Sequence, residues 1–158
     1  MFPPRSSTAT LSGMSYSEEI RTFAHLGRAL WSNPAEGEPI AVDVLSGVCL
    51  LPMDVEPRYE RAAKILLTRA LKSHGPEHLR FDIPFYRLAP RERFLLVAVH
   101  VGNWNYERVA RVLGESPIDI EAALWATRIS LASQTEKALR SYPVGSTVRG
   151  THCPEYDL

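Results

Sequence analysis

The amino-acid sequence predicts an all-α protein made of two small helical domains, the second of which contains a helix-turn-helix. Apolar residues recur at three-to-four spacing along most of the chain, which is the period of an amphipathic helix. Gly75, Pro76 and Pro84 interrupt the pattern over residues 75–87, which we take as a linker that divides the chain in two. In the second part, helical patterns before and after the short break at Gly114 follow each other directly, as in a helix-turn-helix. The length of 158 residues suits two such domains.

The composition indicates a globular protein of the cytoplasm. Lys plus Arg and Asp plus Glu both number 18, so no net charge draws the chain toward nucleic acid or a membrane surface. The two cysteines, Cys49 and Cys153, make no disulfide framework, which favours a reducing compartment. No apolar run approaches the ~20 residues that cross a bilayer, and the N-terminus lacks a signal-peptide core.

The first domain is expected to span residues 15–74, after a disordered tail over residues 1–14 that is rich in Pro, Ser and Thr. A first helix starts near Ser15 or Ser17 and ends at Ser32-Asn33-Pro34. Its predicted buried face consists of Ile20, Phe23, Gly27, Leu30 and Trp31.

Residues 35–51 are ambiguous because their apolar run is rich in β-branched side chains. A strand is one interpretation. We favour a helix, with Pro39 at its first position, because the flanking segments are helical.

A third helix is expected after Asp54 as N-cap, with Pro57 in or near its first turn. Its apolar stripe consists of Tyr59, Ala62, Ala63, Leu66, Leu67 and Ala70. It is the most basic helix of the chain. Residues 75–87 form the predicted linker, whose apolar side chains suggest that it packs on a domain: Phe81, Ile83, Phe85 and Tyr86.

The second domain is expected over residues 88–139. A helix from Pro90 buries Phe94, Leu95, Ala98 and Val99. Asn105 caps the next helix, and Trp104 is placed to pack on Val109 as a hydrophobic staple. Ser116 as N-cap, Pro117 at the first position and Asp119 at the third start a last helix, which runs to about Ala138 with Ile120, Leu124, Thr127 and Leu131 inward. Residues 140–158 are predicted to be an irregular tail.

These residues resemble region 4 of the extracytoplasmic-function sigma factors. The matching positions are Leu88, Pro90, Arg93, then Tyr106-Glu107-x-Val109-Ala110-x-x-Leu113-Gly114-x-Ser116, then Ile120, Leu124, Thr127-Arg128 and Leu131. The family pattern is L-P-x-x-x-R, S-Y-E-E-I-A-x-x-L-G-x-S and V-K-S-R-L-x-R-A-R-x-x-L. In the first half, residues 30–38 and 57–71 resemble parts of the family's region 2. The resemblance implies a region 2, linker and region 4 layout.

Two departures from the family pattern bear on function. Where region 2 carries Asp and Gln that dock on core polymerase, this chain has Pro39 and Val42. Where the recognition helix carries K-S-R, it has Glu121-Ala122-Ala123. A sigma-like chain with these departures also resembles the sigma-like domains of general-stress regulators, which bind an anti-sigma factor. Nothing after Leu139 resembles the receiver domain of those regulators, so we expect no phosphorylation switch within this chain.

The expected electrostatic footprint of the second domain is neutral. Five acidic residues over residues 88–133 oppose five basic ones, which are Arg91, Arg93, Arg108, Arg111 and Arg128. Neutralisation of phosphates supplies much of the affinity for DNA, so this balance is a poor basis for DNA binding.

We therefore expect a sigma-factor-like transcription regulator that works through protein–protein contact with an anti-sigma factor or a related regulator. Candidate partner-binding residues are Trp125, Glu121, Arg58, Arg61 and Lys64. Trp125 is either a contact anchor or a residue packed on the linker near Phe81, Phe85 and Tyr86. Asp119 and Glu121 either mark lost DNA binding or support the helix start.

Two alternatives stay open. One is a functional extracytoplasmic-function sigma factor that binds promoter DNA and core RNA polymerase. The other is a DNA-binding regulator that uses the helix-turn-helix alone. DNA contacts would then come from Arg108, Arg111, Ser116, Glu121, Ala122 and Arg128.

We expect no enzyme activity and no cofactor, because no nucleophile–base pair, paired carboxylates or phosphate loop stands out. His74 and His78, with His152 and Cys153, do not have the spacing of a compact zinc site.

Overall fold

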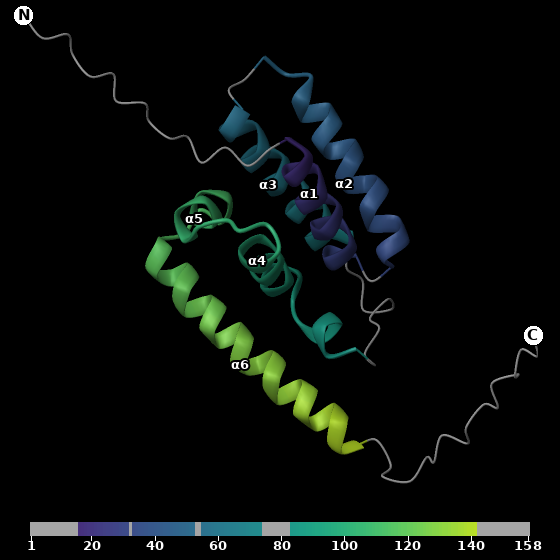
Figure 1. Ribbon diagram of the computed structural model, residues 1–158, viewed down its shortest axis with the longest axis vertical. Coiled ribbons are helices and arrows are strands. Elements are labelled where there is room, and N and C mark those ends of the chain that lie inside the picture. The colour runs from purple at the N-terminus through teal and green to yellow at the C-terminus, as the bar shows by residue number, and fades with distance from the viewer. Residues whose placement is uncertain (1–15, 32, 53–54, 74–82, 142–158) are drawn as a thin grey trace, which may run out of the picture.

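The protein is all-helical in the part that the computed structural model describes, which is residues 16–31, 33–52, 55–73 and 83–141 (Figure 1). In chain order the elements are α1 (Tyr16–Leu30), α2 (Pro34–Cys49), α3 (Val55–Ser73), the 3-10 turn η2 (Pro84–Arg87), α4 (Pro90–His100), α5 (Tyr106–Leu113) and α6 (Pro117–Ser141). The predicted all-α class is confirmed, and residues 35–51 are helical, not a strand. The predicted N-terminal tail, residues 142–158, Asp54 and residues 74–82 lie outside the described residues. Arg140 and Ser141, expected to begin an irregular tail, belong to α6, which is three residues longer than predicted.

The start predicted for α2 is wrong. The helix begins at Pro34, where the side chain of Asn33 accepts a hydrogen bond from the N–H of Ala35 at 3.2 Å. Asn33 is therefore the N-cap and Pro34 the first helical residue, a position that suits proline. Pro39 consequently lies inside the helix, on its exposed side, and cannot donate the backbone hydrogen bond that this position normally makes.

Two glycines allow α1 and α2 to cross at very short range. A Cβ atom added at Gly37 would lie 2.0 Å from the carbonyl oxygen of Gly27, and one added at Gly27 would lie 2.3 Å from the carbonyl oxygen of Gly37. No other residue type fits at either position without moving a backbone. Gly27 therefore belongs to the buried face, as predicted.

The buried face of α1 is rotated slightly from the predicted one. Ile20, expected inside, is 37% exposed, whereas Glu19, Thr22 and Leu26 are buried beside Phe23. The stripe follows residues 19, 22, 23, 26 and 30, so Ile20 lies at its margin. The apolar residues alone do not indicate which side of α1 is buried, because two of its buried residues, Glu19 and Thr22, are polar.

The helix α4 lies at the centre of the fold. It packs against α1, α3, α5 and α6, and Figure 1 shows it between the first three helices and α6. Its side chains are buried nearly all round, including Leu96 and Val97 in addition to the predicted Phe94, Leu95 and Ala98. Val99, predicted inside, is half-buried.

One continuous hydrophobic core joins the two halves of the chain. Its buried residues come from α1, α2 and α3 as well as from α4, α5 and α6. Phe23 of α1, for example, packs on Trp104, which precedes α5, with 6.4 Å between ring centroids. The two halves that the sequence divides at residues 75–87 are thus packed on each other.

Candidate functional site

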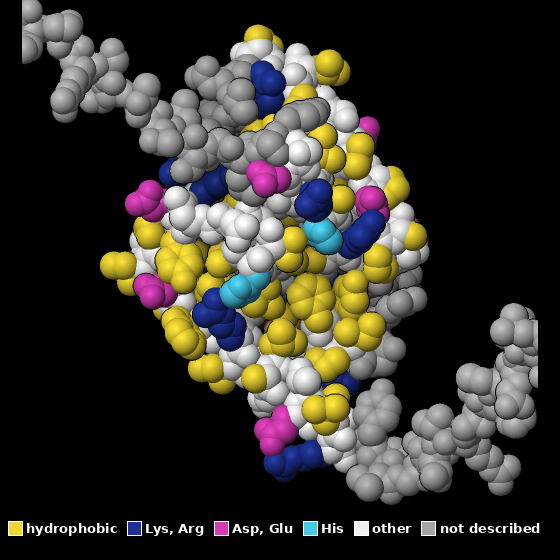
Figure 2. Space-filling model, viewed as in Figure 1, with side chains coloured by type: hydrophobic (Ala, Val, Ile, Leu, Met, Phe, Trp, Pro, Cys, Tyr) yellow, Lys and Arg dark blue, Asp and Glu magenta, His cyan; other side chains and the backbone are white. Residues whose placement is uncertain are grey.

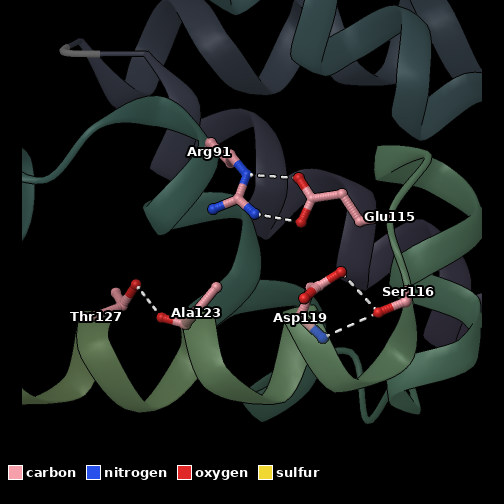
Figure 3. A network of polar contacts seen from close by, with 6 residues as sticks. All are labelled: Arg91, Glu115, Ser116, Asp119, Ala123 and Thr127. Atoms are coloured by element: carbon pink, nitrogen blue, oxygen red, sulfur yellow. Dashed lines mark hydrogen bonds and ion pairs between the residues drawn. The ribbon is translucent and has the colours of Figure 1, made fainter.

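The connection between α5 and α6 is fixed by local hydrogen bonds of the predicted kind. The side chain of Asn105 accepts from the N–H of Arg108 at 2.9 Å, which caps α5. Gly114 ends α5 in the left-handed region with φ of 71°, and its N–H donates to the carbonyl of Ala110 at 2.8 Å. At the start of α6, the hydroxyl of Ser116 accepts from the N–H of Asp119 at 3.2 Å and donates to its carboxylate at 2.7 Å (Figure 3).

The turn is also tied to α4 by a contact that the sequence analysis does not foresee. Arg91 of α4 forms a two-pronged ion pair with Glu115, with N–O distances of 3.1 and 2.5 Å (Figure 3). Bidentate pairing of this kind fixes orientation as well as distance. The pair therefore holds the beginning of α6 in a defined place on α4.

The inward face of α6 agrees with the prediction. Ile120, Leu124 and Thr127 are buried, and Leu131 is half-buried. The hydroxyl of Thr127 donates to the carbonyl of Ala123 at 2.8 Å, so its methyl group is free to face the core (Figure 3). The opposite side of α6 is the exposed face that a helix-turn-helix would present to DNA.

Arg108 is not on that surface. Its guanidinium pairs with the carboxylate of Glu19 on α1 at 2.8 Å and lies 4.0 Å from the ring centroid of Trp104. The side chains of Arg108 and Glu19 are only 15% and 4% exposed. Contact of Arg108 with a DNA backbone would require this partly buried ion pair to break, which makes the DNA role predicted for Arg108 structurally unfavourable.

The other arginines of this half are engaged with protein groups too. Arg111 pairs with Glu60 of α3 at 2.9 Å. Arg128 donates to Nε2 of His100 at 3.2 Å and lies 5.3 Å from the ring centroid of Trp125. The guanidinium groups of Arg111 and Arg128 therefore contact other groups of the protein.

Arg93 is fully buried, 5.5 Å from the ring centroid of Tyr86. Burial lowers the pKa of Arg93, and the charge interaction with Tyr86 opposes that shift. Tyr86 itself donates to the carbonyl of Arg28 at 3.2 Å, so the described end of the predicted linker packs on the protein, as expected. Arg93 is thus part of the protein interior and does not contribute charge to the surface.

The outward face of α6 is apolar along most of its length. Ile118, Trp125 and Ile129 are 77%, 55% and 67% exposed, and Ala122 and Glu121 are exposed between them. Figure 2 shows hydrophobic side chains gathered over the side of the molecule that carries α6. Trp125, predicted either as a contact anchor or as packed on the linker, is more than half exposed, and Phe81 of that linker lies outside the described residues.

The remaining partner-binding candidates lie on α3, away from Trp125. Arg58 donates to the carbonyl of Leu51 at 3.1 Å, while Arg61 and Lys64 are exposed. In Figure 1, α4 and α5 lie between α3 and α6. The structure therefore does not join the two predicted groups into one patch.

Glu19, Arg91, Ile118 and Ile129 are not among the site residues predicted from the sequence. The two isoleucines carried a usable signal, because Ile118, Ala122, Trp125 and Ile129 follow four-three-four spacing on the side of α6 opposite Ile120 and Leu124. Glu19 gave none, since a glutamate in the first turn of a helix is ordinarily exposed.

Within the described ranges, no helix combines the length and apolarity needed to cross a membrane. The same residues contain no group of three or more His, Cys, Asp or Glu side chains placed to hold a metal ion. His74, His78, His152 and Cys153 lie outside them.

Comparison of the chain with protein-family models, with curated proteins and with solved structures gave no match.

Proposed function

We propose that this protein is a sigma-factor-like transcription regulator that acts by protein–protein contact, with an anti-sigma factor or a related regulator as its partner. The observation that carries the proposal is the outward face of α6. Its exposed positions offer Ile118, Ala122, Trp125 and Ile129 with the acid Glu121, where a helix that reads DNA needs Arg, Lys, Asn or Gln.

The positions of the arginines support the same function. All five basic side chains between residues 88 and 133 contact protein groups: Arg91 on Glu115, Arg93 at Tyr86, Arg108 on Glu19, Arg111 on Glu60 and Arg128 at His100. A phosphate contact by any of them competes with an existing interaction. Exposed tryptophan, by contrast, is typical of the residues that dominate protein–protein affinity.

The α2 surface is consistent with a regulator that does not dock on polymerase as a working sigma factor does. The resemblance places polymerase-docking Asp and Gln of region 2 at Pro39 and Val42. Both residues are exposed on α2 beside Ala35 and Ser46, so this surface is largely apolar or neutral apart from Glu38 and Asp43.

A pull-down from the native cell tests the proposal. The immobilised full chain is expected to retain an anti-sigma factor or a related regulator, and not core RNA polymerase. Trp125→Ala should abolish this capture, whereas Leu50→Ala, at a residue of α2's end that is 86% exposed, should leave it unchanged. Capture of core polymerase that is insensitive to Trp125→Ala would overturn the proposal in favour of a working sigma factor.

A further inference from the structure

The exposed apolar residues of α6 form a seam that the rest of the described chain leaves uncovered. Ile118, Ala122, Trp125 and Ile129 repeat at four-three-four spacing, and Ala132 continues the series. This is the spacing by which one helix packs along another in a coiled coil. The protein's own core takes the opposite side of α6, through Ile120, Leu124 and Thr127.

The charges of α6 divide between its two halves. Residues 117–127 carry two acids, Asp119 and Glu121, and no basic side chain. Residues 128–141 carry three basic side chains and one acid, which are Arg128, Lys137, Arg140 and Glu136. The first half of the helix therefore has a formal charge of −2 and the second half a formal charge of +2.

We propose that this seam binds a second copy of the same chain, with the two α6 helices antiparallel. An antiparallel copy places the acidic half of each helix against the basic half of the other, whereas a parallel copy would set like charges side by side. The same surface then serves both partners, as a two-fold symmetric dimer requires.

The shape of α6 is self-complementary in the same register. A groove in the second half of the helix is lined by Arg128, Leu131, Ala132, Thr135, Glu136 and Leu139. When residue 125 of one helix lies opposite residue 132 of the other, Trp125 of each copy faces this groove. The register also sets Asp119 of each copy beside Lys137 of the other, on the same side of the seam, and it sets Glu121 opposite Glu136.

The place of α6 in the fold suits this pairing. Figure 1 shows α6 along one outer side of the molecule, with its second half reaching beyond the neighbouring helices. Small exposed residues beside Trp125, namely Ala122, Ala126 and Ser133, permit the two helices to approach closely. The pairing does not depend on the function proposed above, although an external partner that binds Trp125 would have to displace the second copy.

Sedimentation of the full chain across a concentration series tests the dimer. We expect a dimer that dissociates on dilution, with Kd in the range of about 1–100 µM. Ile129→Glu should give a monomer, because it places two carboxylates in the centre of the seam. Leu50→Glu, an equally drastic change at an exposed residue of α2's end, should leave the dimer intact. Circular dichroism should show unchanged helix content in both variants.

Charge exchange tests the antiparallel arrangement. Asp119→Lys and Lys137→Glu should each weaken the dimer by roughly three- to tenfold, and the double variant should restore its affinity. A chain that stays monomeric up to about 0.1 mM would overturn the proposal. So would a dimer that persists in Ile129→Glu, or a double variant weaker than either single one.

Discussion

Arg108 on α5 and Glu19 on α1 form an ion pair at 2.8 Å that joins the two halves of the chain. The pair lies against the ring of Trp104, which is buried between Phe23 and Phe94. This contact turns Arg108, a candidate for contact with a DNA backbone, toward α1 and away from the exposed face of α6. The relationship of the halves to each other depends on this contact as well as on the shared core.

Removal of one partner of this pair is expected to destabilise the fold strongly. Arg108→Met keeps most of the side-chain volume but leaves the carboxylate of Glu19 buried without its counter-charge. We expect the free energy of unfolding to fall by about 3–5 kcal/mol in urea denaturation. Arg111→Met is the matched control, because the Arg111–Glu60 pair is more exposed, and it should cost less than about 1 kcal/mol. Equal losses in the two variants would contradict this account.

The crossing of α1 and α2 predicts opposite effects for two glycine substitutions in one helix. Gly37→Ala drives a methyl group into the backbone of Gly27 and should lower the free energy of unfolding by about 3 kcal/mol. Gly47→Ala meets no atom within 4 Å and should raise it by about 1 kcal/mol, because alanine favours a helix. Thermal denaturation of both variants checks the difference. A neutral Gly37→Ala would mean that the helices do not cross this closely.

Pro39 should be a source of instability, because it lies inside α2 and not at its start. An interior proline costs a helix about 3 kcal/mol, while its loss gives the unfolded chain about 1 kcal/mol of added conformational freedom. Pro39→Ala is therefore expected to raise the free energy of unfolding by about 2 kcal/mol, measured in urea. Pro34→Ala, at the first helical position, should change it by less than about 1 kcal/mol. The reverse order of the two effects would place the helix start at Pro39.

Local signals predicted much of the fold. The caps at Asn105 and Ser116 and the left-handed end at Gly114 are where the sequence places them, because each depends on residues within one helical turn. The stripe of α3 was likewise predictable from its period. The sequence does not define the start of α2, because two prolines compete for its first position and Asn33-Pro34 also resembles the end of the preceding helix.

Contacts between distant segments were not predictable. No local rule indicates that Glu19 meets Arg108, or that Arg91 reaches Glu115, because each pair depends on how helices far apart in the chain are packed. The neutral charge balance of the second half was visible in the sequence. What the sequence could not supply was the placement of its arginines against the protein, which leaves α6 with an apolar outward face.

Titration of the full chain into fluorescent DNA duplexes at low salt tests most directly the claim that this protein is bound by protein and does not read DNA. A promoter duplex and a scrambled duplex of equal length should bind equally weakly, at about 10⁻⁴ M or above, because few phosphates would be neutralised. Arg128→Ala should then change nothing. Nanomolar binding that favours the promoter duplex, and that Arg128→Ala weakens, would contradict the account.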